Sequence, residues 1–250
     1  MSDAASAGAA HFGWTVLLPV KVLARAKSRL AVLAGPRRRE LALALASDTV
    51  SAVVACPEVD RVIVITSDHL ARRRLAALGA VVVADIAAGS YDAGLDGPGV
   101  LSGAELASQD SLNAALRHGA AVAARRWPGT GIAALTADLP ALRPADLGAA
   151  LRAVRAATGT GADGAARSAF VPDAAGVGTT LYAVVPGGDF RPDFGGASRM
   201  RHAAGGAIEL ALDAPGIRQD VDTPADLRAA VALGAGHRTT ALAAELLADA

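Results

Sequence analysis

Four short apolar runs recur in the first 140 residues, and their alternation with longer helical patterns limits the fold more than any other feature. The runs are WTVLLPV at 14–20, RVIVIT at 61–66, AVVVAD at 80–85 and GIAALTA at 131–137. They are too continuously apolar for strands with one face in water, and they suit a sheet covered on both faces. Helical patterns follow these runs at about 36–55, 68–78, 109–126 and 144–157. The alternation predicts an α/β fold with a doubly wound, Rossmann-like, mostly parallel sheet and helices on both faces.

The second half of the chain has a different rhythm, which makes the predicted sheet a mixed one. ARSAFVPD and TTLYAVVP have the pattern of strands separated by AAGVG, so we expect them to pair antiparallel. AIELAL (207–212) and IRQDV (217–221) predict that the chain then returns to the sheet. Thr223, Pro224 and Asp226 follow with the spacing of a helix cap, a first-turn proline and a capping-box acid.

The length of 250 residues favours one α/β domain over two full domains. We expect a disordered N-terminus at 1–13, a single domain over 14–234 and a helical C-terminal tail at 235–250. One segment, 87–103, has five glycines and no periodicity. A loop of that length is either a functional lid or a disordered insertion, and the sequence supports both interpretations equally.

Charge and cysteine content narrow the class of partner. Lys plus Arg and Asp plus Glu number 24 each, so no overall field draws the chain to nucleic acid or to an anionic membrane. A small-molecule substrate is the better expectation. The single Cys56 excludes an intramolecular disulfide and fits a reducing cytoplasm. The N-terminus has no signal-peptide pattern, and no apolar run reaches the length of a membrane span, so we expect a cytoplasmic protein.

Common nucleotide and hydrolase signatures do not account for the chemistry. GTGADG at 159–164 matches G-x-G-x-x-G, but it follows a helix and precedes a strand, which reverses the dinucleotide-binding context. We interpret it as a linker. The sequence contains no P-loop, H-E-x-x-H or G-x-S-x-G pattern.

A cluster of cations follows the first apolar run. PVKVLARAKSRL at 19–30 places Lys21, Arg25, Lys27 and Arg29 in the loop before the first helix. Ligands of doubly wound sheets bind beyond the carboxyl ends of the strands, where this loop must lie. The position favours a triphosphate site over a solvated basic face.

Carboxylates follow two of the later segments. Asp138 ends the run ALTAD just before Leu139 and Pro140, and QDVDTPADL contains Asp220 and Asp222. An aspartate near a proline is often only a turn residue, and Asp222 also has a place in helix-start electrostatics. Convergent carboxylates together with phosphate oxygens nevertheless make the usual site for Mg²⁺. Asp220 is the stronger candidate for the second ligand.

Small and hydroxyl residues mark a further candidate site in GVGTTL at 176–181 and DFGGASRMRHAAGG at 193–206. Ser198 is expected to cap a helix there, whose backbone N–H groups would bind a carboxylate or phosphate. An ordinary serine cap with glycine turns explains the same spacing.

Taken together, these motifs resemble a known enzyme family. They are PVK and AKSRL (19–30), SDTV with Asp48, LNAAL (112–116), ADLPAL (137–142), FVPD with GTTL (170–181), FGGASRMRHAAGGA (194–207) and DVDTPADL (220–227). In this order the chain resembles the phosphoenolpyruvate or 2-phospholactate guanylyltransferases of deazaflavin coenzyme F-420 biosynthesis. That family belongs to the larger MobA-like nucleotidyltransferase group, whose fold is that of nucleotide-diphospho-sugar transferases.

The resemblance implies a role for each motif. GTP would lie against Lys21, Lys27, Ser28 and Arg29, with Asn113 near the nucleoside. Mg²⁺ would be held by Asp138 and by Asp220, Asp222 or both, and Lys21, Lys27 and Asp138 would be catalytic. The acceptor's carboxylate and phosphate would meet Thr180, Gly195 and Ser198, and a downstream transferase of the same pathway is an implied partner.

Two other functions fit the same fold. One is a MobA-like enzyme that guanylylates or cytidylylates another cofactor precursor, against which the FGGASRMRHAAGG element argues. The other is a non-catalytic nucleotide-binding module, against which the set of Asp138, Asp220 and Asp222 argues. The sequence also leaves open whether the acceptor is phosphoenolpyruvate, 2-phospholactate or 3-phosphoglycerate.

Overall fold

The computed structural model describes residues 12–21, 23, 27–85, 110–158 and 167–248. The predicted lid or insertion at 87–103, the linker at 159–164 and nearly all of the predicted disordered N-terminus lie outside these residues. None of the described helices is long and apolar enough to cross a membrane.

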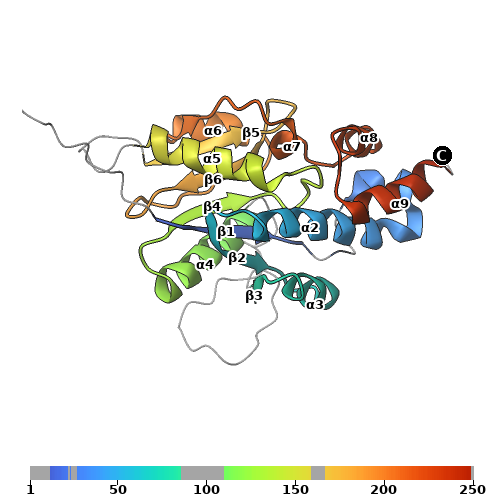
Figure 1. Cartoon of the computed structure of the whole chain (residues 1–250), viewed down its shortest axis with the longest axis horizontal. Helices are drawn as coiled ribbons and strands as arrows, with labels where there is room; N and C mark the ends of the chain where they lie inside the picture. Colours follow the sequence, from blue (N-terminus) through green and yellow to red (C-terminus); the bar gives the residue numbers. More distant parts are fainter. Residues whose placement is uncertain (1–11, 22, 24–26, 86–109, 159–166, 249–250) are drawn as a thin grey trace, which may run out of the picture.

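A seven-stranded mixed sheet forms the centre of the protein, in the order β3-β2-β1-β4-β6-β5-β7 (Figure 1). The strands are β1 (Trp14–Pro19), β2 (Val59–Ile65), β3 (Val81–Val83), β4 (Gly131–Leu135), β5 (Ser168–Pro172), β6 (Thr179–Val184) and β7 (Ile208–Glu209). Strands β1 to β4 are mutually parallel, whereas β6 pairs antiparallel with both β4 and β5. The predicted mostly parallel sheet with an antiparallel addition is confirmed.

Helices cover both faces of the sheet because successive side chains of each buried strand point to opposite sides. Val16 and Leu18 of β1 pack in one apolar cluster with residues of α2, α3 and α5, and Leu17 packs in a second cluster with α4. The longer helices are α2 (Arg38–Val54), α3 (His69–Ala76), α4 (Asp110–Arg126), α5 (Pro144–Ala157), α8 (Pro224–Ala232) and α9 (His237–Ala248). The shorter ones are η1 (Ser28–Leu30), α1 (Ala31–Ala34), η2 (Gly35–Arg37), α6 (Ser198–Ala204) and α7 (Pro215–Arg218).

The return of the chain to the sheet after α6 is much shorter than predicted. AIELAL contributes only the two-residue strand β7, and the strand predicted at IRQDV is wrong because α7 occupies its start. Pro215 begins that helix, and Gly216 lies so close to the backbone of the 139–142 segment that a Cβ there would be 2.3 Å from the carbonyl oxygen of Ala141. The helix start predicted after it is confirmed, because Thr223 and Asp226 form a reciprocal capping box.

The C-terminal helix α9 lies against α2 (Figure 1). Leu242 and Leu246 of α9 join Leu41 and Leu45 of α2 in a third apolar cluster. The buried carboxylate of Asp48 reinforces this contact, since it accepts hydrogen bonds from the Thr239 N–H at 2.7 Å and from Arg238 at 3.2 Å. The helix predicted at 235–250 is therefore packed into the body of the protein.

Candidate active site

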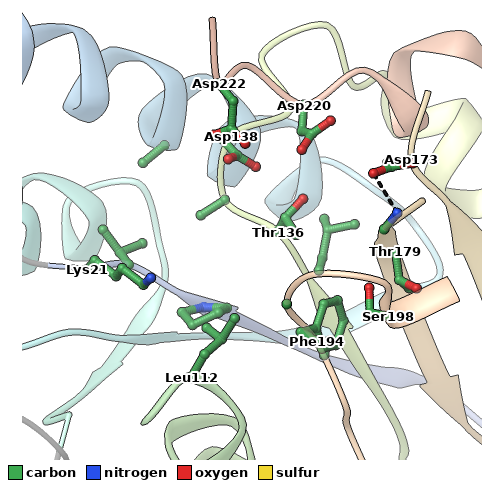
Figure 2. Close-up of a pocket in the computed structure, with 18 of the residues that line it drawn as sticks. Lys21, Leu112, Thr136, Asp138, Asp173, Thr179, Phe194, Ser198, Asp220 and Asp222 are labelled. Carbon is green, nitrogen blue, oxygen red and sulfur yellow. Dashed lines mark hydrogen bonds between the residues drawn. The ribbon is translucent and has the colours of Figure 1, made fainter. Parts of the chain in front are cut away.

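A cavity of about 570 Å³ opens where β1 and β4 end and β6 begins (Figure 2). Of the predicted site residues, it is lined by Lys21, Lys27, Arg29, Asp138, Gly195, Ser198, Asp220 and Asp222. Segments that are far apart in the sequence thus meet at one edge of the sheet, as expected for the carboxyl ends of parallel strands.

Lys27 joins two of the predicted carboxylates. Its ammonium group donates to Oδ2 of Asp138 and, over 2.8 Å, to Oδ1 of Asp222, and its side chain is only 12% exposed. Burial lowers the pKa of Lys27, but the two carboxylates together raise it by a larger amount. The net pKa is therefore above the ordinary value for lysine. Lys27 is therefore a permanent cation at the centre of the acidic cluster. Its φ of 55° is unusual for a residue with a side chain, which indicates a conformation imposed by this position.

The loop that carries Lys27 is anchored by a residue that the sequence did not single out. The buried carboxylate of Asp68 accepts the Leu23 N–H at 3.1 Å through one oxygen. Its other oxygen caps α3 by accepting the N–H groups of Leu70 and Ala71. One side chain thus ties the basic loop to the end of β2. Ser28 begins η1 in the same loop.

A backbone hydrogen bond brings the segment with Asp220 and Asp222 close to Asp138. The Val221 N–H donates to the carbonyl oxygen of Asp138 at 3.1 Å, so Asp220 and Asp222 flank a point directly beside β4 (Figure 2). Burial raises the pKa of Asp220 to about 7, with smaller contributions from the negative charges of Asp138 and Asp222. Burial also raises the pKa of Asp222, but Lys27 more than offsets this and the net pKa falls. Asp138 and Asp222 thus share one ammonium group, and Asp220 forms no ion pair with any residue that the structure describes.

The carboxylates of the cavity are chemically suited to bind a divalent cation, although their side chains do not converge on a common metal position. No group of three or more His, Cys, Asp or Glu side chains within the described ranges is placed to hold a metal ion. The reason is that Asp138 and Asp222 converge on the Lys27 ammonium. Oδ1 of Asp138 is buried without a hydrogen-bond partner, however, and Asp220 faces the same space. An unpaired carboxylate oxygen in an acidic pocket is the donor that Mg²⁺ prefers.

The other end of the cavity is formed by the turn before α6. Gly195 and Gly196 have φ values of 103° and 45°, which glycine adopts without strain, and they present backbone to the cavity. The prediction that Ser198 caps α6 is wrong, because Ala197 is the N-cap residue and no side-chain cap is present. Ser198 is instead the first residue of the helix, and its buried side chain lines the cavity.

Two predicted site residues lie just outside the lining. The Thr180 hydroxyl is buried and donates to the carbonyl oxygen of Val171 at 3.4 Å, whereas its neighbour Thr179 lines the cavity. Neighbouring strand residues face opposite ways, so only one of the two can do so. Asn113 is buried in α4 and exchanges two hydrogen bonds with the backbone of Phe194, at 2.8 and 3.1 Å. Asn113 therefore holds the turn before α6 in place.

Thr136 and Asp173 also line the cavity, although neither is among the site residues predicted from the sequence. Thr136 is two residues before Asp138 at the end of β4, and its Oγ1 is buried without a hydrogen-bond partner. Asp173 accepts the N–H groups of Val177 and Gly178, at 2.9 and 2.7 Å, and so fixes the turn before β6. Asp173 is the last residue of FVPD, and Thr136 directly precedes ADLPAL, so their positions in and beside these motifs were the available signal.

The chain is similar to proteins of one named activity over nearly its whole length. A phosphoenolpyruvate guanylyltransferase of Thermomonospora curvata is 53% identical over 238 residues, covering 95% of this chain and 91% of that protein. One of Streptomyces coelicolor is 52% identical over 236 residues, covering 94% and 97%. No family model matches the chain.

Among solved structures, a protein of Desulfovibrio desulfuricans G20 described as a nucleotide-diphospho-sugar transferase has a TM-score of 0.62. The match covers 94% of this chain and 95% of that one, at 16% sequence identity. It supports the predicted fold and nothing finer. The sequence relatives are specific, and by them this chain belongs to the phosphoenolpyruvate guanylyltransferase family.

Proposed function

We propose that this protein transfers GMP from GTP to the phosphate group of phosphoenolpyruvate and releases pyrophosphate. Relatives with about half their residues identical carry that activity in their names. The observation that carries the proposal is the meeting of the basic loop, the acidic cluster and the Gly195 turn in one cavity. A cavity with these three features supports a reaction that brings together a triphosphate, a cation and a small acid.

The reaction needs no general base. A phosphate monoester has a second pKa of about 6, so the acceptor is largely a dianion at neutral pH and can attack directly. One acceptor oxygen forms a bond to the α-phosphorus of GTP, and the bond from that phosphorus to the β-phosphate bridging oxygen breaks. Pyrophosphate leaves with the electron pair. The main barrier that the protein must lower is repulsion between two anions.

Three cations of the first loop fit this task. Lys21 and Arg29 are exposed and line the cavity, where they contribute to the lowered pKa of Asp222. We assign them, with Ser28, to the β- and γ-phosphates of GTP. Lys27 is mostly buried and permanently charged, and we assign it to the α-phosphate, where negative charge is redistributed during the transfer. Asn113 is bonded to the Phe194 backbone, so we propose that it acts through the Gly195 turn that it holds rather than on the nucleoside directly.

Asp138, with Asp220 or Asp222, is proposed to hold Mg²⁺, which would neutralise phosphate charge and orient the triphosphate when bound. The unpaired Oδ1 of Asp138 and the raised pKa of Asp220 support this assignment. The neighbouring Thr136 hydroxyl is proposed to donate to a substrate oxygen.

The acceptor is proposed to bind at the Gly195 turn. Ser198 presents a hydroxyl there and Gly195 a backbone without a side chain, while Thr180 would act through the β6 backbone. We further propose that the protein acts in the cytoplasm and in coenzyme F-420 biosynthesis, with a downstream transferase that consumes its diphosphate product.

The test is pyrophosphate release by purified protein with Mg²⁺ and GTP. Phosphoenolpyruvate, 2-phospholactate and 3-phosphoglycerate are offered in turn, and GTP is then replaced by ATP and by CTP. The proposal requires the highest kcat/KM with phosphoenolpyruvate and GTP. A higher kcat/KM with 2-phospholactate or 3-phosphoglycerate would change the acceptor but keep the guanylyltransferase. Release only with a different cofactor precursor would support the MobA-like alternative, and nucleotide binding without any release would support a non-catalytic module.

A further inference from the structure

His202 lies buried behind the acceptor end of the cavity, with only 3% of its surface exposed. Its ring stacks on Tyr182, with centroids 4.6 Å apart and planes 14° from parallel, and the edge of Phe194 approaches it at 5.3 Å. Nδ1 is 2.9 Å from Oγ1 of Thr179, and Nε2 is 3.0 Å from the backbone nitrogen of Asp193. The ring therefore connects β6 to the turn that leads to Gly195.

These two contacts determine which ring nitrogen has the proton. A backbone N–H can only donate, so Nε2 must accept from Asp193 and must be unprotonated. A neutral imidazole has one proton, which is consequently on Nδ1. The Nδ1–H group then donates to Oγ1 of Thr179. Burial lowers the pKa of His202 to about 4, and the nearby Asp193 and Arg201 act on it in opposite directions, so the ring is neutral at neutral pH.

A hydroxyl that accepts from Nδ1–H keeps its own proton for another partner. The described residues offer the Thr179 hydroxyl no other hydrogen bond, and Thr179 lines the cavity close to Ser198 (Figure 2). We propose that His202 is a positioning residue that makes Thr179 a fixed hydrogen-bond donor to an anionic oxygen of the acceptor. This inference rests on the proposed function for the identity of the acceptor, but not for the state of the ring.

The arrangement has a clear advantage for anion binding. A free threonine hydroxyl rotates and can present either a lone pair or a proton, and a lone pair would repel a carboxylate. When Nδ1–H occupies one lone pair of the Thr179 oxygen, the hydroxyl proton can point only in the remaining directions. Less conformational entropy of the hydroxyl is then lost when the acceptor binds. The same ring holds the Asp193 N–H, so the donor and the Gly195 turn are positioned together.

Steady-state kinetics test the role of Thr179. Thr179→Val should raise KM for phosphoenolpyruvate about tenfold while KM for GTP stays within about twofold, and Thr179→Ser should restore most of the affinity. Thr158→Val is the matched control, because it removes another buried threonine hydroxyl, bonded to the Val154 carbonyl oxygen in a different part of the chain. Its KM values should both equal those of the wild type. Unchanged acceptor KM in Thr179→Val would overturn the proposal.

A double-mutant cycle tests whether His202 acts through Thr179. His202→Phe preserves a planar ring but loses both hydrogen bonds, whereas the amide nitrogen of His202→Asn can take the place of Nδ1. We expect the phenylalanine variant to raise acceptor KM and the asparagine variant to recover part of it. In the Thr179→Val background the phenylalanine effect should shrink to the part that comes from the lost contact with the Asp193 N–H. An undiminished effect in that background would contradict a positioning role.

The tautomer can be measured without any substrate. Long-range ¹H–¹⁵N correlation spectra of the wild-type protein should show His202 protonated on Nδ1, and those of Thr179→Val should retain this state because Asp193 still donates to Nε2. A proton on Nε2 would overturn the inference whatever the protein catalyses. If His202 has its proton on Nδ1 but the protein does not use phosphoenolpyruvate, only the proposed acceptor is disproved. The KM comparisons are then made with the acceptor that the protein does turn over.

Discussion

The Val221 N–H donates to the Asp138 carbonyl oxygen at 3.1 Å, and this bond brings the two acidic segments of the cavity together. No strand pairing supports it, since the segment from Gln219 to Thr223 is irregular. The carboxylates on both sides of Val221 are therefore held near Asp138 by one backbone bond and by the Lys27 ammonium. Substitutions of these carboxylates or of Lys27 should therefore affect catalysis more than folding, whereas Val221 itself is fully buried.

Asp138→Asn should lower kcat by orders of magnitude while the far-ultraviolet circular dichroism spectrum and the unfolding temperature stay near those of the wild type. The substitution removes the charge that faces Lys27 and the unpaired oxygen assigned to Mg²⁺. Asp213→Asn, at an exposed position away from the cavity, is the control and should be fully active. Near-normal turnover in Asp138→Asn would remove this residue from the mechanism.

The choice between Asp220 and Asp222 can be made by metal binding without turnover. Mn²⁺ binding in the presence of GTP, followed by electron paramagnetic resonance, should weaken about tenfold or more in whichever asparagine variant has lost a ligand. We expect the larger loss in Asp220→Asn, because Asp222 already pairs with Lys27, whereas on Asp220 the repulsion from Asp138 and Asp222 outweighs the attraction of Lys27. Equal Mn²⁺ affinity in the wild type and both variants would refute a metal role for either residue. Removal of divalent cations with a chelator should abolish pyrophosphate release and be reversed by added Mg²⁺.

Thr136→Val should raise the stability of the protein and lower its turnover. A buried hydroxyl without a partner costs about 1–3 kcal/mol, so its replacement by a methyl group of similar size should raise the free energy of unfolding by about 1 kcal/mol. Turnover should fall about tenfold because a substrate oxygen loses its donor. Thr158→Val should do the opposite, with lower stability and normal turnover. Unimpaired turnover in Thr136→Val would mean that the unpaired hydroxyl has no part in the reaction.

His202 should make the protein less stable in acid. Its folded-state pKa of about 4 is below the ordinary value of 6.5, so between these pH values the unfolded chain binds a proton that the folded protein does not. The stability that His202 contributes is complete above about pH 6.5 and is lost as the pH falls to about 4, by an amount on the order of 3 kcal/mol.

Urea unfolding at several pH values checks this expectation. The difference in free energy of unfolding between the wild type and His202→Phe should shrink as the pH falls through that window, whereas exposed His69→Gln should follow the wild-type curve. The neighbours of the ring, Asp193, Arg201 and Tyr182, are the same in the wild type and in both variants. The difference between the curves therefore reports mainly on His202. Parallel curves for wild type and His202→Phe would exclude a buried neutral histidine.

Asp48→Ala should destabilise the protein by about 2–3 kcal/mol, because it leaves the buried Thr239 N–H unpaired and loosens α9 from α2. Thermal unfolding measures the loss. The folded fraction should keep its KM for both substrates, since Asp48 does not line the cavity. A changed KM at unchanged stability would instead assign Asp48 to the active site.

Much of the fold could be predicted because its signals are local. Continuous apolar runs identified the buried strands, and the Thr223 cap with Asp226 identified the start of α8, since each depends on neighbouring residues alone. The same locality explains the error at IRQDV. Those residues have a strand pattern, but Pro215 begins a short helix that ends at Arg218, Gly216 packs tightly against Ala141, and the remaining residues of the segment are irregular.

The residues of the site were also largely determined by the sequence, because loops at the carboxyl ends of parallel strands must converge. What the tertiary structure alone decided is which groups touch. Thr179 rather than Thr180 faces the cavity because adjacent strand residues point opposite ways, and the register of β6 against β4 and β5 fixes which does. The bonds of Lys27 to Asp138 and Asp222, of Asn113 to Phe194 and of His202 to Thr179 join residues far apart in sequence, and no local pattern specifies a long-range contact.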